Sequence, residues 1–172
     1  MQKKDLFLWR HRQKQMSISL LSGCGSKSAK KEDAETITVY LWSTNLYEKY
    51  APYITYAFCS FDGDDEAAKE HLKFIHSLGP ELVSLTRGSK GCIMYDGEQF
   101  YTQPATLIDN VVDTMGAGDS FLTSFMDCYI DQLKRGTDRQ EAIRTSLKEA
   151  SKFAAHVCTL NGAFGYGKPY ED

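Results

Sequence analysis

The sequence predicts an α/β fold from about residue 54 onward, on three observations. Short β-rich runs at 54–60 and 82–85 flank a segment in which apolar residues recur at helical spacing. A Gly-x-Gly turn at 116–118 separates a β-branched run from a long amphipathic segment. The chain has 172 residues, which is enough to build one domain around a hydrophobic core.

The first predicted unit is strand, helix, strand. The run 54–60 is broken by Asp62-Gly63-Asp64-Asp65, which supplies residues that cap helix N-termini. The helix should then cover 66–78, where Gly79-Pro80 ends it. The run 82–85 predicts a buried strand, so the three segments should form a right-handed βαβ unit.

The second half predicts a hairpin followed by two helices. Residues 92–95 and 100–101 flank an Asp-Gly turn at 96–97. The apolar run from Ile108 to Val112 predicts a further strand that leads into the glycine turn. One helix should then cover 120–133, and a capping box at 137–140 should start another that runs to about Val157.

The turn Asp113-Thr114-Met115-Gly116-Ala117-Gly118-Asp119 carries the clearest chemical signal. A glycine turn at a helix N-terminus presents backbone N–H groups to an anion, above all a phosphate. An aspartate there would repel a resting phosphate. Asp119 is therefore better explained as a general base that takes a proton from a hydroxyl attacking phosphorus.

The same seven residues match the D-T-x-G-A-G-D signature of the ribokinase-like (PfkB) carbohydrate kinases, and Ser120-Phe121 continue it. The resemblance covers 54–172. It implies the C-terminal part of a ribokinase-like three-layer α/β/α sandwich, an ATP-dependent phosphotransferase that acts on an alcohol group, and ATP with Mg²⁺. A less specific resemblance, to fructoselysine 6-kinases, rests on 56–60, on the Asp-Gly-Asp-Asp turn and on the ending 162–167.

The resemblance also implies site residues. Asp119 would be catalytic, together with the Gly116, Ala117 and Gly118 amides. Nucleotide binding would use Thr86, Gly88, Lys90 and Gly91 after one strand, and Ala155, Cys158, Asn161, Gly162 and Ala163 around the end of the last helix. Two metal roles are weaker. Glu66 would be linked to Mg²⁺, although the asparagine of the family's Asn-x-x-Glu is absent, and Asp113 would bind a monovalent cation such as K⁺ or simply cap the turn.

Residues 1–53 differ in character and are interpreted as a foreign or disordered segment. Residues 16–53 resemble the N-terminus of an ABC-transporter sugar-binding lipoprotein, with a lipobox-like Leu21-Ser22-Gly23-Cys24, a charged tether at 26–35 and a first strand at 37–42. The apolar stretch before Cys24 is shorter than a secretory signal needs, and basic residues precede it. We therefore expect a cytoplasmic protein that is not lipidated.

Composition excludes several classes of partner. The formal net charge is −3 and the basic residues do not cluster outside the N-terminus, so nucleic-acid binding is not expected. No apolar run is long enough to span a bilayer, so a membrane is not expected either. The five widely spaced cysteines indicate unpaired thiols, with Cys59, Cys92 and Cys158 in the core. The expected partners are ATP and a sugar or glycated amino acid; the oligomeric state is not predicted.

Three functional interpretations stay open at this point: a carbohydrate kinase preserved as its C-terminal part, a fragment of a lipid-anchored sugar-binding transport protein, and a non-functional fusion. The complete motif lies in the kinase-like part, which favours the first. In that family the N-terminal half supplies the sugar-binding residues and the lid. A chain without them should bind nucleotide better than it turns over a sugar.

Overall fold

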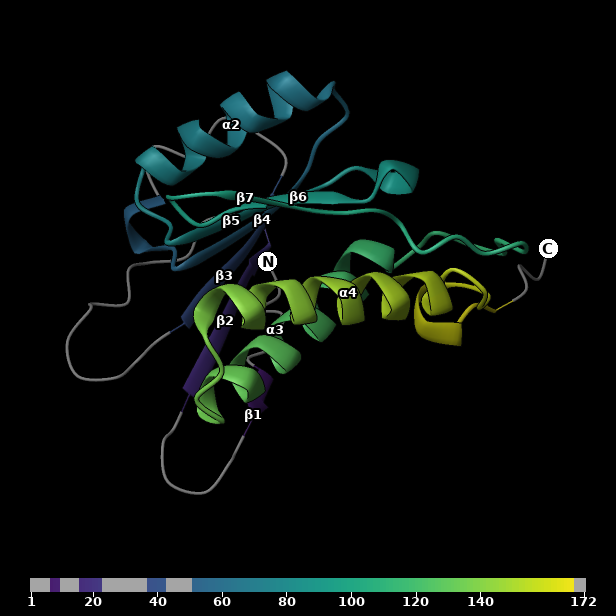
Figure 1. Cartoon of the computed structure of the whole chain (residues 1–172). Coiled ribbons are helices and arrows are strands. Elements are labelled where there is room, and N and C mark those ends of the chain that lie inside the picture. Colours follow the sequence, from purple (N-terminus) through teal and green to yellow (C-terminus); the bar gives the residue numbers. More distant parts are fainter. Residues whose placement is uncertain (1–6, 10–15, 23–36, 43–50, 169–172) are drawn as a thin grey trace. The chain divides into compact units, whose positions relative to one another are not determined.

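The computed structural model describes residues 7–9, 16–22, 37–42 and 51–168, with side chains described from residue 51 onward (Figure 1). Cys24 and the tether at 26–35 lie outside the described residues. In the part of the chain that is described, no helix combines the length and apolar character needed to cross a bilayer.

The strands form one mixed sheet whose order follows the chain, β1 to β7. β1 is antiparallel to β2, β2 is parallel to β3 and β3 is parallel to β4, with Val39 opposite Tyr56. The predicted strand at 37–42 is confirmed as β3. The boundary drawn at residue 53 stays a prediction. The strands are β1 (Phe7–Trp9), β2 (Met16–Ser22), β3 (Ile37–Trp42), β4 (Tyr56–Ser60), β5 (Leu82–Thr86), β6 (Cys92–Tyr95) and β7 (Phe100–Gln103).

Helices account for the remaining regular structure of the described residues. Three of those described are α-helices: α2 (Asp65–Ser77), α3 (Ala117–Lys134) and α4 (Arg139–Val157). Three are short 3₁₀ turns: η1 (Ala51–Tyr53), η2 (Gly88–Lys90) and η3 (Ala163–Gly165). The chain divides into two compact units, Met1–Leu85 with Ile93–Phe100 and Thr86–Cys92 with Tyr101–Asp172.

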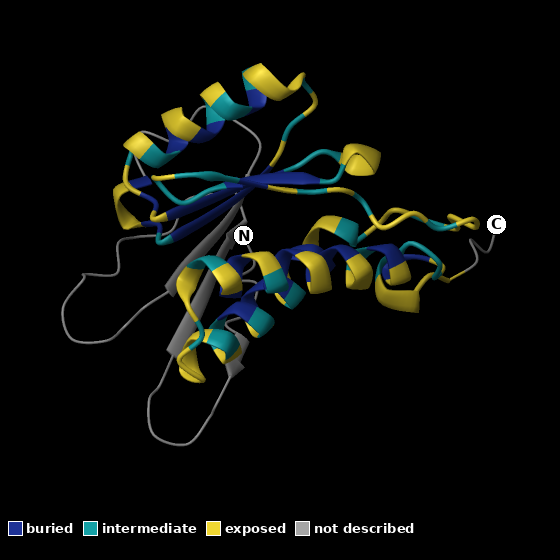
Figure 2. Ribbon diagram, viewed as in Figure 1, coloured by how far each residue is buried: buried dark blue, intermediate teal, exposed yellow. Residues whose placement is uncertain are grey.

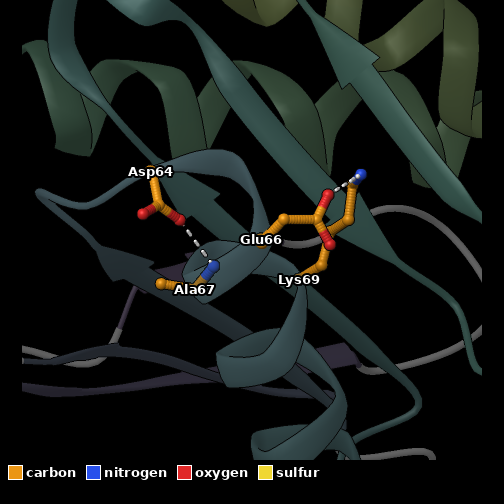
Figure 3. A network of polar contacts seen from close by, with 4 residues as sticks. All are labelled: Asp64, Glu66, Ala67 and Lys69. Atoms are coloured by element: carbon orange, nitrogen blue, oxygen red, sulfur yellow. Dashed lines mark hydrogen bonds and ion pairs between the residues drawn. The ribbon is translucent and has the colours of Figure 1, made fainter.

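The first unit has its core between α2 and the strands. Ala68, Leu72 and Ile75 of α2 pack in one cluster with residues of β4, β5 and β6, and all are buried (Figure 2). The predicted cap is confirmed, because an Asp64 carboxylate oxygen accepts the Ala67 N–H at 2.8 Å (Figure 3). This core fixes β5, the strand that leads into the second unit.

The second unit is built on the pairing of α3 with α4. Phe125 and Met126 of α3 and Ile143 and Leu147 of α4 are among its buried residues, and Figure 2 shows the buried stretches along both helices. The two helices thereby hold the turn before α3 and the loop after α4 within one compact unit.

Two sequence predictions in this unit are wrong in detail. The run from Ile108 to Val112 forms no strand, because the Val112 N–H donates to the Cys158 carbonyl at 2.9 Å rather than to a neighbouring strand. The capping box at 137–140 is replaced by a simpler cap. Asp138 accepts the N–H groups of Gln140 and Glu141, while the Thr137 hydroxyl bonds the Gln132 side chain.

Candidate functional site

The glycine turn opens α3 three residues earlier than predicted. Gly116 is the N-cap and adopts a left-handed conformation, φ 81° and ψ 0°, which a side chain would strain. Ala117 and Gly118 are therefore already helical, and the N–H groups of a helix's first turn have no acceptors within the helix itself. The Ala117 N–H donates to the Thr114 carbonyl at 3.2 Å. This leaves the Gly118 N–H as the best placed to meet an anion.

Asp119 lies in the first turn of α3 and is exposed. Its backbone carbonyl accepts the Thr123 hydroxyl at 2.8 Å. Within residues 51–168 its carboxylate makes no ion pair or hydrogen bond, so it is available to a substrate hydroxyl. A Cβ built on the neighbouring Gly118 would meet nothing within 4 Å, so a ligand can approach the backbone beside Asp119.

Asp113 connects this turn to the loop after α4. One carboxylate oxygen accepts the Met115 N–H at 2.9 Å, and the other accepts the Gly162 N–H at 3.1 Å. The Asp113 N–H itself donates to the Cys158 carbonyl at 3.2 Å. The glycine turn, which is predicted to bind the phosphates, and the loop after α4, which is predicted to bind the adenine, therefore lie side by side.

The loop after α4 is tightly folded. A Cβ on Gly162, at φ 70°, would come within 2.5 Å of the Gly167 backbone, so only glycine fits there. Ala163 lies against the glycine turn, with its Cβ 3.3 Å from where a Gly116 Cβ would stand. Ala155 is buried in the last turns of α4, whereas Cys158 is partly exposed, so the prediction of a core Cys158 is wrong.

Phe164 lies beside the glycine turn, a position that the sequence does not predict. It is the only non-glycine residue at positive φ among the described residues, at 58°, and its ring lies 3.5 Å from the Gly116 Cβ position. A bulky side chain in this conformation is strained. The flanking Gly162 and Gly165, both at positive φ, were the available signal for an irregular loop.

The loop after β5 forms a closed turn around η2. The Arg87 N–H donates to the Gly91 carbonyl at 2.8 Å, and the Gly91 N–H donates back to the Gly88 carbonyl at 3.0 Å. Both glycines have positive φ, and a Cβ on Gly91 would collide with the Gln103 carbonyl oxygen. Lys90 is exposed at the turn, as a phosphate ligand would have to be. Thr86 ends β5 and is half-buried.

The cysteine after this loop is not a nucleophile. Burial raises the pKa of the Cys92 thiol to about 12, against a smaller opposing effect of the hydrogen bond with the Gln103 backbone. Cys59 is equally buried, so the prediction of core thiols is confirmed for both.

Glu66 is the one predicted site residue that belongs to the first unit. It lies on the first turn of α2, and its carboxylate pairs with Lys69 at 3.0 Å (Figure 3). Its link to Mg²⁺ stays a prediction. Among the described residues, no group of three or more His, Cys, Asp or Glu side chains could hold a metal ion by itself.

We expect Gly116→Ala to destabilise the second unit by about 1–2 kcal/mol, because a Cβ in the left-handed region strains the backbone and would press on Ala163. Gly118→Ala is the matched control, since that glycine has ordinary helical geometry and open space around it. Urea unfolding of both variants measures the difference. Equal stability of the two variants would contradict this description of the turn.

Comparison with known proteins places the sequence in context. The family described as pfkB family carbohydrate kinase matches residues 26–165. The fructosamine kinase of Bacillus subtilis is 37% identical over 134 residues, covering 75% of this chain and 44% of that protein. The fructoselysine 6-kinase of Shigella flexneri is 39% identical over 85 residues, covering 49% of this chain and 32% of that protein.

The fold is similar to that of solved ribokinase-like structures. Aminoimidazole riboside kinase from Salmonella enterica, solved with aminoimidazole riboside and an ATP analog, aligns with a TM-score of 0.61 at 19% identity. The alignment covers 76% of this chain and 48% of that one. The predicted ribokinase-like α/β fold is thereby confirmed. The chain spans less than half the length of each of these three proteins.

Proposed function

Because the chain belongs to the pfkB family of carbohydrate kinases, we propose that its second unit is the nucleotide half of a kinase that transfers the γ-phosphoryl group of ATP to a sugar hydroxyl. The observation that carries the proposal is Asp119, exposed and unpaired in the described structure beside the open backbone of Gly118. A general base and donors for developing negative charge are what such a transfer requires.

In the proposed reaction, Asp119 accepts the proton of the sugar hydroxyl. That oxygen bonds to the γ-phosphorus while the bond from phosphorus to the oxygen bridging to the β-phosphate breaks, and ADP leaves. Backbone N–H groups of the turn, Gly118 above all, stabilise charge on the transferring oxygens. Asp119 thus acts on the attacking oxygen by taking its proton, and the turn stabilises the charge on the phosphoryl group.

The described residues fit a nucleotide that brings Mg²⁺ bound to its phosphates. Mg²⁺ usually binds through substrate phosphates rather than in an all-protein cage, and the described side chains form no such cage. When bound, Mg²⁺ would neutralise phosphate charge during transfer. Each Asp113 oxygen accepts one N–H and keeps further lone pairs. A K⁺ role for Asp113 therefore remains part of the proposal.

For the substrate we propose a fructosamine, with the 6-hydroxyl of fructoselysine as the acceptor. The support is the similarity to the Bacillus subtilis and Shigella flexneri enzymes named above. We also propose a cytoplasmic location, because ATP is the phosphoryl donor. Incorporation of a labelled fatty acid at Cys24 would contradict this location.

We expect the 172-residue chain to bind ATP·Mg²⁺ in isothermal titration calorimetry, because the turn at 113–119, the loop at 86–91 and the loop at 158–163 lie in one unit. Its sugar-kinase turnover should be at least about 100-fold below that of the Bacillus fructosamine kinase, since misplacing a substrate by about 1 Å costs that much. A folded sample that gives no heat with ATP would contradict the nucleotide site, and turnover at the rate of the relative would contradict the expected deficit.

We expect saturating ATP to slow the alkylation of Cys158 by iodoacetamide, because the adenine would cover the end of α4. Cys128 on α3 is partly exposed as well but lies outside the proposed site, so its alkylation rate is the internal control. Peptide mass spectrometry follows both thiols in one sample. Equal rates with and without ATP at Cys158 would rule out adenine at this position.

A further inference from the structure

Asp113 has an unusual set of contacts for a residue in an irregular segment. Its two carboxylate oxygens accept N–H groups from different parts of the chain: one from Met115, two residues away, and one from Gly162, forty-nine residues away. Within residues 51–168, no other side chain hydrogen-bonds between the segments 111–116 and 158–163. The side chain therefore supplies the polar connection between these two segments.

The backbone around Asp113 reinforces the same connection. The Cys158 carbonyl accepts two N–H groups, from Val112 at 2.9 Å and from Asp113 at 3.2 Å. This carbonyl is at the C-terminal end of α4, where helix carbonyls lack internal partners. Backbone N–H groups before α3 thus donate to the carbonyl at the end of α4. The Asp113 carboxylate accepts the Gly162 N–H in the loop that follows α4.

Apolar contact completes the junction. Ala163 and the Phe164 ring both lie beside Gly116, the residue that sets the direction of the α3 N-terminus. A shift of the loop at 162–164 would therefore change the contacts around Gly116. Hydrogen bonds to a charged acceptor are stronger than neutral ones and impose a narrower geometry, so the carboxylate is the element that fixes this contact.

We infer that Asp113 is a positioning residue that holds the loop at 158–163 at a set distance from the turn at 116–119. The adenine and the phosphates of one nucleotide would then be bound by two segments that are joined by this carboxylate and by the two backbone hydrogen bonds to the Cys158 carbonyl. This inference rests on the proposed function, because only a bound nucleotide uses both segments at once. Asp113 acts through Gly162 and Met115 and does not itself touch the nucleotide.

The first test is hydrogen exchange on the full chain. Asp113→Ala should raise the exchange rate of the Gly162 and Met115 amides about 10- to 100-fold, the range expected for loss of a hydrogen bond to a charged acceptor. Amides in the middle of α4 should be unchanged. Asp109→Ala is the control, because Asp109 is exposed in the same segment and makes no such bond in the described structure. An unchanged Gly162 rate would overturn the inference.

The second test asks whether Asp113 joins the two segments or only contributes to phosphate binding. In calorimetry, Asp113→Ala should raise the Kd for ATP·Mg²⁺ about tenfold or more but change the Kd for magnesium tripolyphosphate less than about threefold, because tripolyphosphate has no adenine to bind the loop at 158–163. Equal weakening of both ligands would overturn the inference. If the wild-type chain binds neither ligand, the proposed function fails, while the Gly162 exchange rate still decides whether Asp113 joins the segments.

Asp113→Asn is a second variant for both tests, in case the alanine variant does not fold. The asparagine oxygen can accept one of the two N–H groups, but its NH₂ group faces the other donor. We expect an effect in the same direction and smaller than that of alanine in both tests. Full retention of the wild-type exchange rate at both amides in Asp113→Asn would show that the carboxylate charge and its second oxygen are not needed.

Discussion

Asp119→Asn should lower kcat for sugar phosphorylation by about 10³-fold, in the middle of the range that a general base contributes. Asparagine keeps the shape of the side chain but cannot take the proton from the attacking hydroxyl. Its amide fits the exposed position as aspartate does, so stability should change little. ATP affinity should not fall, because the substitution removes a negative charge that would repel the phosphates. The expected signature is therefore a loss in kcat without a matching loss of ATP affinity.

This experiment needs a protein with a complete sugar site. A chimera in which the N-terminal half of the Bacillus subtilis fructosamine kinase replaces residues 1–53 is suitable, because this chain covers only 44% of that enzyme. Asp127→Asn is the matched control, since Asp127 is exposed on the same helix and lies outside the first turn. An Asp119→Asn chimera that phosphorylates fructoselysine at the parent rate would show that another group is the base.

Phe125→Ala should have the largest effect on stability, a loss of about 3–5 kcal/mol. Phe125 is completely buried on α3, and its ring stacks on Tyr129 with the centroids 5.4 Å apart. Truncation would leave a cavity on the buried side of α3. Because a domain's total stability is about 5–15 kcal/mol, this loss is a large share of it.

Urea unfolding measures this loss, and Phe153→Ala is its control. Phe153 lies on α4 with 40% of its surface exposed, so its truncation should change stability by less than about 0.5 kcal/mol. The turn before α3 depends on the same helix pair, so Phe125→Ala should also weaken ATP binding. A small loss, similar to that of Phe153→Ala, would contradict the complete burial of Phe125.

Local patterns predicted most elements after residue 54. The helical spacing from Ala67 to Ile75 and the Asp-Gly turn at 96–97 depend on neighbours in sequence, and α2 and the β6–β7 pair follow them. The run from Ile108 to Val112 has strand-like residues, yet the Val112 N–H donates to the Cys158 carbonyl instead of to a neighbouring strand. Only the tertiary structure could reveal that competing partner.

The candidate site was predicted in part. The motif predicts Asp119 and the glycine turn as site residues, and the structure shows Asp119 exposed in the first turn of α3. The start of α3 was placed too late, since Gly118 and Asp119 resemble turn residues although both lie in the helix's first turn. The bond from Asp113 to Gly162 spans forty-nine residues and leaves no local signal. Phe164 was missed because nothing in its own side chain indicates a left-handed backbone.

The most direct test of the central claim, that the second unit holds ATP by its phosphates at the α3 N-terminus, is an NMR titration of the ¹⁵N-labelled chain with ATP·Mg²⁺. The amide resonances of Gly116, Ala117 and Gly118 should shift most, together with those of Asn161–Ala163. The amides in the second half of α2, away from Glu66, should stay in place. Shifts confined to α2 or absent from 116–118 would contradict the claim.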